Sequence, residues 1–327
     1  MQAITYENTA TTLPRWDVNL HNRQSRGYAY RDGPFNFHFY GTGEYTYAIS
    51  PGLTASERTE LPVKGWALKT FGAKGILSMQ RNVGEVVAGV WRPGLWKSEE
   101  IYAALEISEH EARNAEQGLR ILVEKLDEIL LYIEPSEAGL QTYGHKTREL
   151  LILACTEVEN CWVQYLALAG QATNKASTNQ YVKLHAPLHL SDYEVSYPLF
   201  NDSLIVRPFA TWDAANPTTS LLWYDAYNRT KHNRTTYFHL ATLENCLHAV
   251  AAVVAMFCAR YSPFPLINGA STLSVLVRQH MNIKLRDPDP TSFYVPLINR
   301  PSDWRAELMC VTADQFIAPY TRTPLIL

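Results

Sequence analysis

Apolar residues recur at intervals of three and four along residues 108–169, which is the spacing of helices with one buried face. These positions are Ala112, Ala115, Leu119, Leu122, Leu126, Ile129 and Ile133 in a first run, then Leu150, Leu151, Ala154, Val158, Cys161, Trp162, Tyr165 and Leu166. The segment Ser108-Glu-His-Glu111 has the form of a capping box, so it predicts a helix that starts near Ser108 and ends before Pro135. A second helix is expected over residues 142–169, and the two predict a long antiparallel hairpin.

Alternating apolar residues predict two β-hairpins elsewhere in the chain. The first has Phe35, Phe37 and Phe39 on one strand, a turn at Gly41-Thr-Gly43, and Tyr45, Tyr47 and Ile49 on the other. The second spans residues 193–208, with its turn at 201–203. Single strands are expected at 85–91 and 292–295. Residues 15–31 show little periodicity and place four arginines among polar residues, which predicts an extended arm.

Further helices are expected at 220–233 and at 238–260, and six prolines between residues 263 and 301 predict an irregular tail. The apolar run at 249–259 is about half of the roughly 20 residues that a membrane span needs, so it indicates a buried helix and no membrane association. The pattern predicts an α+β protein, with a mainly helical core and β-containing N- and C-terminal extensions. We divide it into a β-rich region at 1–95, a helical domain at 96–262 with a β-hairpin insertion at 171–218, and a Pro-rich extension at 263–327.

Composition and charge narrow the function classes. The chain has 327 residues, 46% of them hydrophobic, and a formal net charge of −3, so it should fold fully and has no overall basic field for nucleic acid. Residues 98–170 hold 14 acidic and 5 basic residues, so this segment carries −9 and the remainder +6. A helix-turn-helix at 98–119 is rejected, because Glu109, Glu111 and Glu116 would be repelled by DNA phosphates. The N-terminal residues do not have the pattern of a secretory signal, and the five cysteines form no Cys-x-x-Cys pair, so we expect a cytoplasmic protein with reduced, buried cysteines.

The densest set of chemically capable side chains lies at residues 223–234. On a helix, Asp225, Asn228 and His232 share one face, and Arg229 lies one turn after Asp225 and can pair with it. Lys231, His232 and Arg234 crowd the last turn, where the helix dipole favours cations. One interpretation is therefore purely structural: a helix end stabilised by positive side chains, with His232 bonded to Asn228.

A second interpretation comes from a family resemblance. A helix with Asn228-x-x-x-His232, placed after a long helical hairpin and before an apolar helix, resembles the HEPN superfamily of all-helical domains, whose motif is Arg-Asn-x-x-x-His. Tyr227 stands where that family has arginine, and Arg229 and Arg234 lie close by but outside the family's register. The resemblance covers residues 98–262 and implies a HEPN-like bundle core.

The resemblance also implies an activity: metal-independent cleavage of RNA by a ribose 2′-hydroxyl, in a cleft between two subunits of a homodimer. His232 would transfer protons, Arg229 or Arg234 would hold the phosphate, and Asn228 would orient it. The remaining residues expected to bind or position the RNA substrate are Lys231, Tyr227, Asp225 and Glu157. Glu157 has the simpler alternative of a solvated residue at the edge of its helix.

Enzymes of this kind are toxins or act in antiviral defence, so RNA and a neutralising or sensor protein are the expected partners. No cofactor or metal is expected, because His185 and His189 are separated by a proline-containing segment and Glu244 and His248 have no evident third ligand. No nucleotide-binding or hydrolase motif occurs. Two alternatives stay open: a non-catalytic HEPN-like module that dimerises or binds a ligand or partner, and a helical scaffold unrelated to that family.

Overall fold

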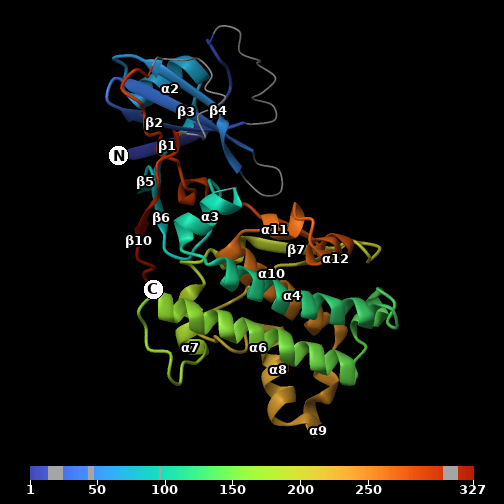
Figure 1. Ribbon diagram of the computed structural model, residues 1–327. Coiled ribbons are helices and arrows are strands. Elements are labelled where there is room, and N and C mark those ends of the chain that lie inside the picture. Colours follow the sequence, from blue (N-terminus) through green and yellow to red (C-terminus); the bar gives the residue numbers. More distant parts are fainter. Residues whose placement is uncertain (14–24, 43–47, 96, 305–315) are drawn as a thin grey trace. The chain divides into compact units, whose positions relative to one another are not determined.

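A computed structural model describes residues 1–13, 25–42, 48–95, 97–304 and 316–327 (Figure 1). The chain divides into two compact units. Unit 1 comprises residues 1–88, 92–105 and 288–323, and unit 2 comprises residues 89–91, 106–287 and 324–327. Unit 1 therefore combines the N-terminal region with residues 98–105 and with most of the Pro-rich extension, whereas residues 263–287 belong to the helical unit.

Unit 1 is built on a five-stranded antiparallel sheet with the strand order β4-β3-β2-β1-β5. Its strands are β1 (Gln2–Glu7), β2 (Arg26–Asp32), β3 (Phe35–Thr42), β4 (Ala48–Arg58) and β5 (Lys74–Asn82). The unit also contains α2 (Val63–Phe71), α3 (Ser98–Leu105), a 3-10 turn at Pro290–Ser292, and the parallel pair β6 (Glu85–Val87) and β10 (Thr321–Thr323). The pairing of β3 with β4 confirms that the first predicted hairpin forms, with Phe35 opposite Arg58 and Thr42 opposite Ala48. The turn predicted at Gly41-Thr-Gly43 was misplaced, because Gly41 and Thr42 still belong to β3 and pair with β4.

Each face of this sheet carries a buried apolar cluster, and the two-residue period of the strands decides which side chain joins which cluster. Tyr28, Tyr30, Phe37 and Phe39 belong to one apolar cluster, while Ala29 belongs to the other, together with Trp66 and Phe71 of α2. The prediction of an extended arm was therefore wrong for residues 26–31, which form β2. Tyr28 and Tyr30 of β2 are buried, and the strand pairs with β3. Arg15 and Arg23 of the predicted arm, and Tyr45 and Tyr47 of the first hairpin, lie outside the described residues.

The first cluster is completed by a C-terminal segment. Phe293, Val295 and Ile298 pack on it, and the carbonyl of Val295 accepts a hydrogen bond from the amide of Gly84. The strand predicted at 292–295 does not form: a 3-10 turn ends at Ser292, and the next residues are extended but outside any ladder. Pro290 and Pro296 lack the amide hydrogens that a ladder needs, so the segment is held by side-chain burial. The strand predicted at 85–91 is likewise shorter, ending at Val87.

Unit 2 is mainly helical. Its principal helices are α4 (Glu109–Leu130), α6 (His145–Leu168), α8 (Leu222–His232), α10 (Leu243–Tyr261) and α12 (Thr272–His280). The shorter elements are α5 (Glu137–Leu140), α7 (Thr178–Tyr181), α9 (Arg234–Tyr237), α11 (Phe264–Ile267), and 3-10 turns at Val182–Leu184, Leu190–Asp192 and Phe238–Leu240. Its sheet contains β7 (Tyr193–Tyr197), β8 (Leu204–Val206) and β9 (Asn282–Leu285). The pairing of β7 with β8 confirms the second predicted hairpin, and β9 extends it from the C-terminal side.

The long helical hairpin is confirmed. The hydroxyl of Ser108 accepts a hydrogen bond from the amide of Glu111, so α4 starts where the capping signal placed it. Lys125 Nζ lies 2.7 Å from Glu149 Oε1 and Lys146 Nζ lies 2.9 Å from Glu128 Oε1. Because a later residue on α6 pairs with an earlier residue on α4, the two helices run antiparallel.

Helix α10 forms the centre of unit 2 and contacts α4, α6 and α8 (Figure 1). Helix α6 in turn contacts both α4 and α8. It begins at Leu243 rather than at residue 238, because the hydroxyl of Thr242 accepts from the amide of Asn245 and residues 238–240 form a 3-10 turn. In the described part of the chain, this is the one helix long and apolar enough to cross a membrane. Most of its apolar window, 83%, is buried inside the fold, as in a core helix of a soluble protein. The protein is thus a mixed α and β structure with a helical core in one unit.

Candidate functional site

The candidate residues lie on α8 and on the turn that follows it. Trp223, Ala226, Tyr227 and Thr230 form the buried face of α8, while Lys231, His232 and Arg234 are exposed. The helix ends at His232, and the Asn233 side chain accepts a hydrogen bond from the amide of Thr236 to start α9. Arg148 of α6 donates to the carbonyl of Thr230 at 3.2 Å, so α6 satisfies a backbone acceptor of the last turn of α8. This end of α8 is therefore held firmly against the bundle.

Tyr227, which stands in the register of the HEPN arginine, is fully buried in a hydrogen-bond network. Its hydroxyl donates to Glu159 Oε2 at 3.1 Å, and the Tyr224 hydroxyl donates to Oε1 of the same carboxylate at 2.6 Å. Lys231 Nζ donates to the Tyr227 hydroxyl at 2.7 Å. Burial is the main cause that raises the pKa of Tyr227 and of Tyr224, so both phenols keep their protons near neutral pH.

The network also fixes the charge of Lys231. Its hydrogen bond with Tyr227 is the main cause that raises the Lys231 pKa, so the ammonium stays charged. The ammonium also lies 4.9 Å from the centre of the Tyr227 ring, within the range of a cation–π contact. Lys231 is thus an exposed cation whose position is set by a buried tyrosine.

Three polar residues of the candidate set, Asp225, Asn228 and Arg229, make contacts within α8 itself. Asp225 Oδ2 lies 2.8 Å from Arg229 Nε, and the Arg229 guanidinium also lies over the ring of Tyr237. Asn228 Nδ2 donates to the backbone carbonyl of Tyr224 at 3.1 Å. Arg229 is therefore neutralised by Asp225, and the Asn228 side chain bonds to its own helix rather than to His232.

His232 and Arg234 differ from Arg229. In the described part of the chain, neither has a carboxylate within ion-pair distance, and His232 makes no side-chain hydrogen bond. The Arg234 guanidinium lies 5.6 Å from the ring centre of Phe238. Phe238 also packs on His145 and Tyr143, which lie at the start of α6. The end of α8 is thus a surface where His232 and Arg234, neither of them paired with a carboxylate, lie beside aromatic rings.

Glu157 does not join this surface. It lines a groove between α4, α6 and α10, and its carboxylate accepts a long hydrogen bond of 3.5 Å from Asn160. The acid that reaches α8 is Glu159, two residues further along α6. The sequence contained a signal for this role of Glu159. Cys155 lies four residues before it, Trp162 three residues after it and Leu166 seven residues after it, so Glu159 lies on the same side of α6 as these buried residues.

The chemistry available at the end of α8 is proton transfer by an imidazole and binding of anions by two cations. Among the described residues, no three side chains of His, Cys, Asp or Glu gather so as to hold a metal ion. Cys155, Cys161, Cys246 and Cys258 are free thiols, and burial raises the pKa of each, so they are not nucleophiles near neutral pH. Comparison with protein-family models, with curated proteins and with solved structures gives no match for this chain.

Proposed function

We propose that the protein is a metal-independent endoribonuclease with a HEPN-like helical core, and that His232 at the end of α8 is its proton-transfer group. The observation that supports this most is the exposed set of His232, Lys231 and Arg234, none of which has a carboxylate within ion-pair distance among the described residues. Such a set attracts a phosphodiester and leaves the imidazole free to act.

In the proposed reaction, the ribose 2′-oxygen loses its proton to a base and forms a bond to the adjacent phosphorus. The bond from phosphorus to the 5′-oxygen breaks, and an acid protonates that oxygen, which leaves a 2′,3′-cyclic phosphate and a 5′-hydroxyl. Arg234 and Lys231 would hold the phosphate oxygens, because a guanidinium and an ammonium stabilise the charge that develops there. Arg229 is a weaker candidate for binding the phosphate, since its guanidinium already forms an ion pair with Asp225.

The reaction needs both a base and an acid, and α8 contributes one histidine, His232, from each chain. Two copies related by a two-fold axis would supply two His232 side chains to one cleft. We therefore propose a homodimer, which should sediment at about twice 37.1 kDa at micromolar concentration. A strict monomer would contradict this composite site.

The test of the activity is His232→Ala with a fluorescent RNA in EDTA. Loss of the proton-transfer group should slow cleavage by about 10²-fold to 10⁴-fold while the circular dichroism spectrum stays the same, because the side chain is exposed. Arg234→Ala should also weaken cleavage strongly and Arg229→Ala less. His110→Ala removes an exposed histidine of α4 and is the matched control. An RNA-cleaving toxin should also arrest growth of the expressing cell, and the His232 variant should not.

A second candidate function is a non-catalytic module that dimerises or binds a ligand or partner protein. The observation that favours it is Tyr227, since a buried phenol bonded to Glu159 fills the register where the HEPN family has its arginine. This second function would be favoured if the wild-type protein binds RNA or a partner protein without cleaving RNA, and if the His232→Ala variant binds equally well.

A further inference from the structure

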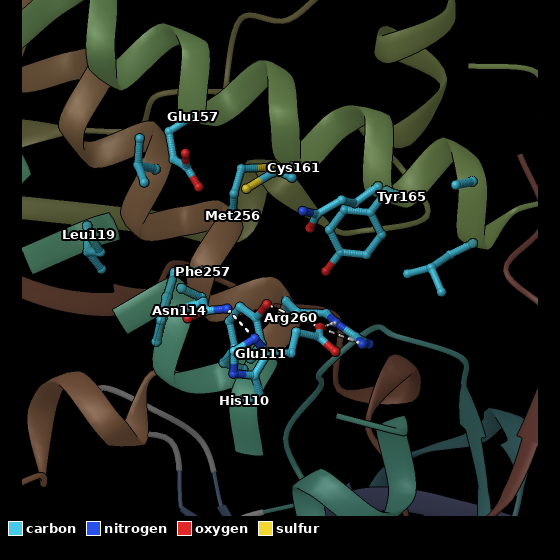
Figure 2. Close-up of a pocket in the computed structure, with 16 residues that line it drawn as sticks. His110, Glu111, Asn114, Leu119, Glu157, Cys161, Tyr165, Met256, Phe257 and Arg260 are labelled. Carbon is cyan, nitrogen blue, oxygen red and sulfur yellow. Dashed lines mark hydrogen bonds and ion pairs between the residues drawn. The ribbon is translucent and has the colours of Figure 1, made fainter. Parts of the chain in front are cut away.

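Unit 2 contains a groove of about 720 Å³ between α4, α6 and α10 (Figure 2). None of the α8 residues proposed to act on RNA lines it. Its apolar walls come from Ala115 and Leu119 of α4 and from Val253, Met256 and Phe257 of α10. This volume is in the range of pockets that take small organic molecules, and Met256 offers an adaptable, polarisable surface.

The polar groups at one end of the groove satisfy one another. Arg260 Nη2 lies 2.8 Å from Glu111 Oε1, and the Tyr261 hydroxyl donates to the same oxygen at 3.2 Å. The Arg260 side chain is only 12% exposed. Because Glu111 neutralises Arg260, neither charge is available to a ligand without breaking this pair.

Glu157 is different. Figure 2 shows its side chain leaving α6 and entering the groove, and in the described part of the chain its one hydrogen bond is the 3.5 Å contact with Asn160. Burial raises the pKa of Cys161 beside it to about 12, so the thiol is neutral and the carboxylate is the uncompensated charge of the groove. The acidic and basic side chains of the lining, which are Glu111, Glu157 and Arg260, therefore carry one net negative charge.

The opposite wall leaves room in front of this carboxylate. Gly118 lies within α4, and a Cβ added there would have Glu157 Oε1, at 3.9 Å, as its one neighbour within 4 Å among the described residues. A glycine inside a helix destabilises it relative to alanine, and here the missing side chain keeps an open space beside Oε1.

We propose that this groove binds a small amphipathic cation, with a protonated amine at Glu157 and an alkyl or aromatic body along Leu119, Met256 and Phe257. Charge complementarity selects the cation, because an anion would meet Glu157 and find Arg260 already paired. A neutral molecule of the same shape would bury the same apolar area without the charge-assisted hydrogen bond.

The test compares three probes that share an octyl tail and differ in their head group: octylammonium, octanol and octanoate. Each is titrated calorimetrically, below its aggregation concentration, into the 327-residue protein. Octylammonium should bind about 10-fold tighter than octanol, and octanoate weakest of all. Glu157→Gln keeps the shape of the side chain but removes its charge, so it should abolish the preference for octylammonium over octanol. The matched control is Glu124→Gln on the exposed surface of α4.

A second variant locates the site. Ala115→Trp places a large ring in the groove and should abolish binding of octylammonium and of octanol together. Gly118→Ala should keep the helix signal but weaken binding of octylammonium, because its added methyl takes up the open space beside Glu157 Oε1. The proposal is overturned if no probe binds the wild type, if octanoate binds as well as octylammonium, or if Glu157→Gln and Glu124→Gln have the same effect.

Discussion

The network around Glu159 gives the sharpest test of how α8 is held. Glu159 accepts hydrogen bonds from the buried phenols of Tyr224 and Tyr227, whereas Glu157, two residues away on the same helix, accepts one long bond from Asn160. We expect Glu159→Leu to destabilise the fold strongly and Glu157→Gln to leave it nearly unchanged. The pair is well matched, because both residues lie on α6 and both are partly exposed.

The magnitude follows from the number of hydroxyls that lose their acceptor. A hydrogen bond to a charged group contributes about 1.5–3 kcal/mol, and a buried donor left unsatisfied costs about 1–3 kcal/mol. Glu159→Leu removes two such bonds at a side chain that water partly reaches, so the free energy of unfolding should fall by about 2–4 kcal/mol. Glu159→Gln keeps one acceptor oxygen and should cost about 1 kcal/mol.

Urea unfolding followed by tryptophan fluorescence measures these changes, since Trp162 and Trp223 both pack on Tyr224. Combining Glu159→Leu with Tyr224→Phe and Tyr227→Phe should recover most of the lost stability, because no hydroxyl then remains unsatisfied. Equal losses for Glu159→Gln and Glu157→Gln, or no recovery in the combined variant, would refute the reasoning.

Three further predictions concern the fold. Ser108→Ala should lower the free energy of unfolding by about 1 kcal/mol, measured by urea titration, because it removes the cap of α4. Burial lowers the pKa of His185 and of His248 in the folded protein, so as the pH falls these histidines take up protons more readily in the unfolded chain. The free energy of unfolding should therefore be constant above about pH 6.5 and decline below it. In His248→Gln this decline should be shallower. Far-ultraviolet circular dichroism should report close to the 45% helix of the structure, and a helix content well below a third would contradict the assignment of unit 2.

Local patterns were enough for the elements whose side chains repeat. The three- and four-residue spacing of apolar positions and the capping signal at Ser108 predicted α4 and α6, and alternation predicted both hairpins. In each case the residues that specify the element are its own near neighbours, so the sequence carries the information directly.

Elements that depend on distant partners were not predicted. The order of the sheet, in which β5 pairs with β1, and the burial of Phe293 and Val295 against it need contacts far apart in sequence. The predicted strand at 292–295 failed for this reason: its apolar residues are buried against a face of the sheet and do not join its ladder.

The candidate site divides in the same way. The sequence by itself determined that cations and His232 gather at the end of one helix, because Lys231, His232 and Arg234 are near neighbours in the chain where the helical pattern stops. The four-residue spacing of Asp225 and Arg229 also predicted their ion pair, which the structure confirms at 2.8 Å. Only the tertiary structure decided that Tyr227 is buried beneath Glu159 and that Glu157 instead enters a separate groove. The reason is physical: the period of a helix gives the direction of each side chain, but the partner it meets depends on how the helices pack.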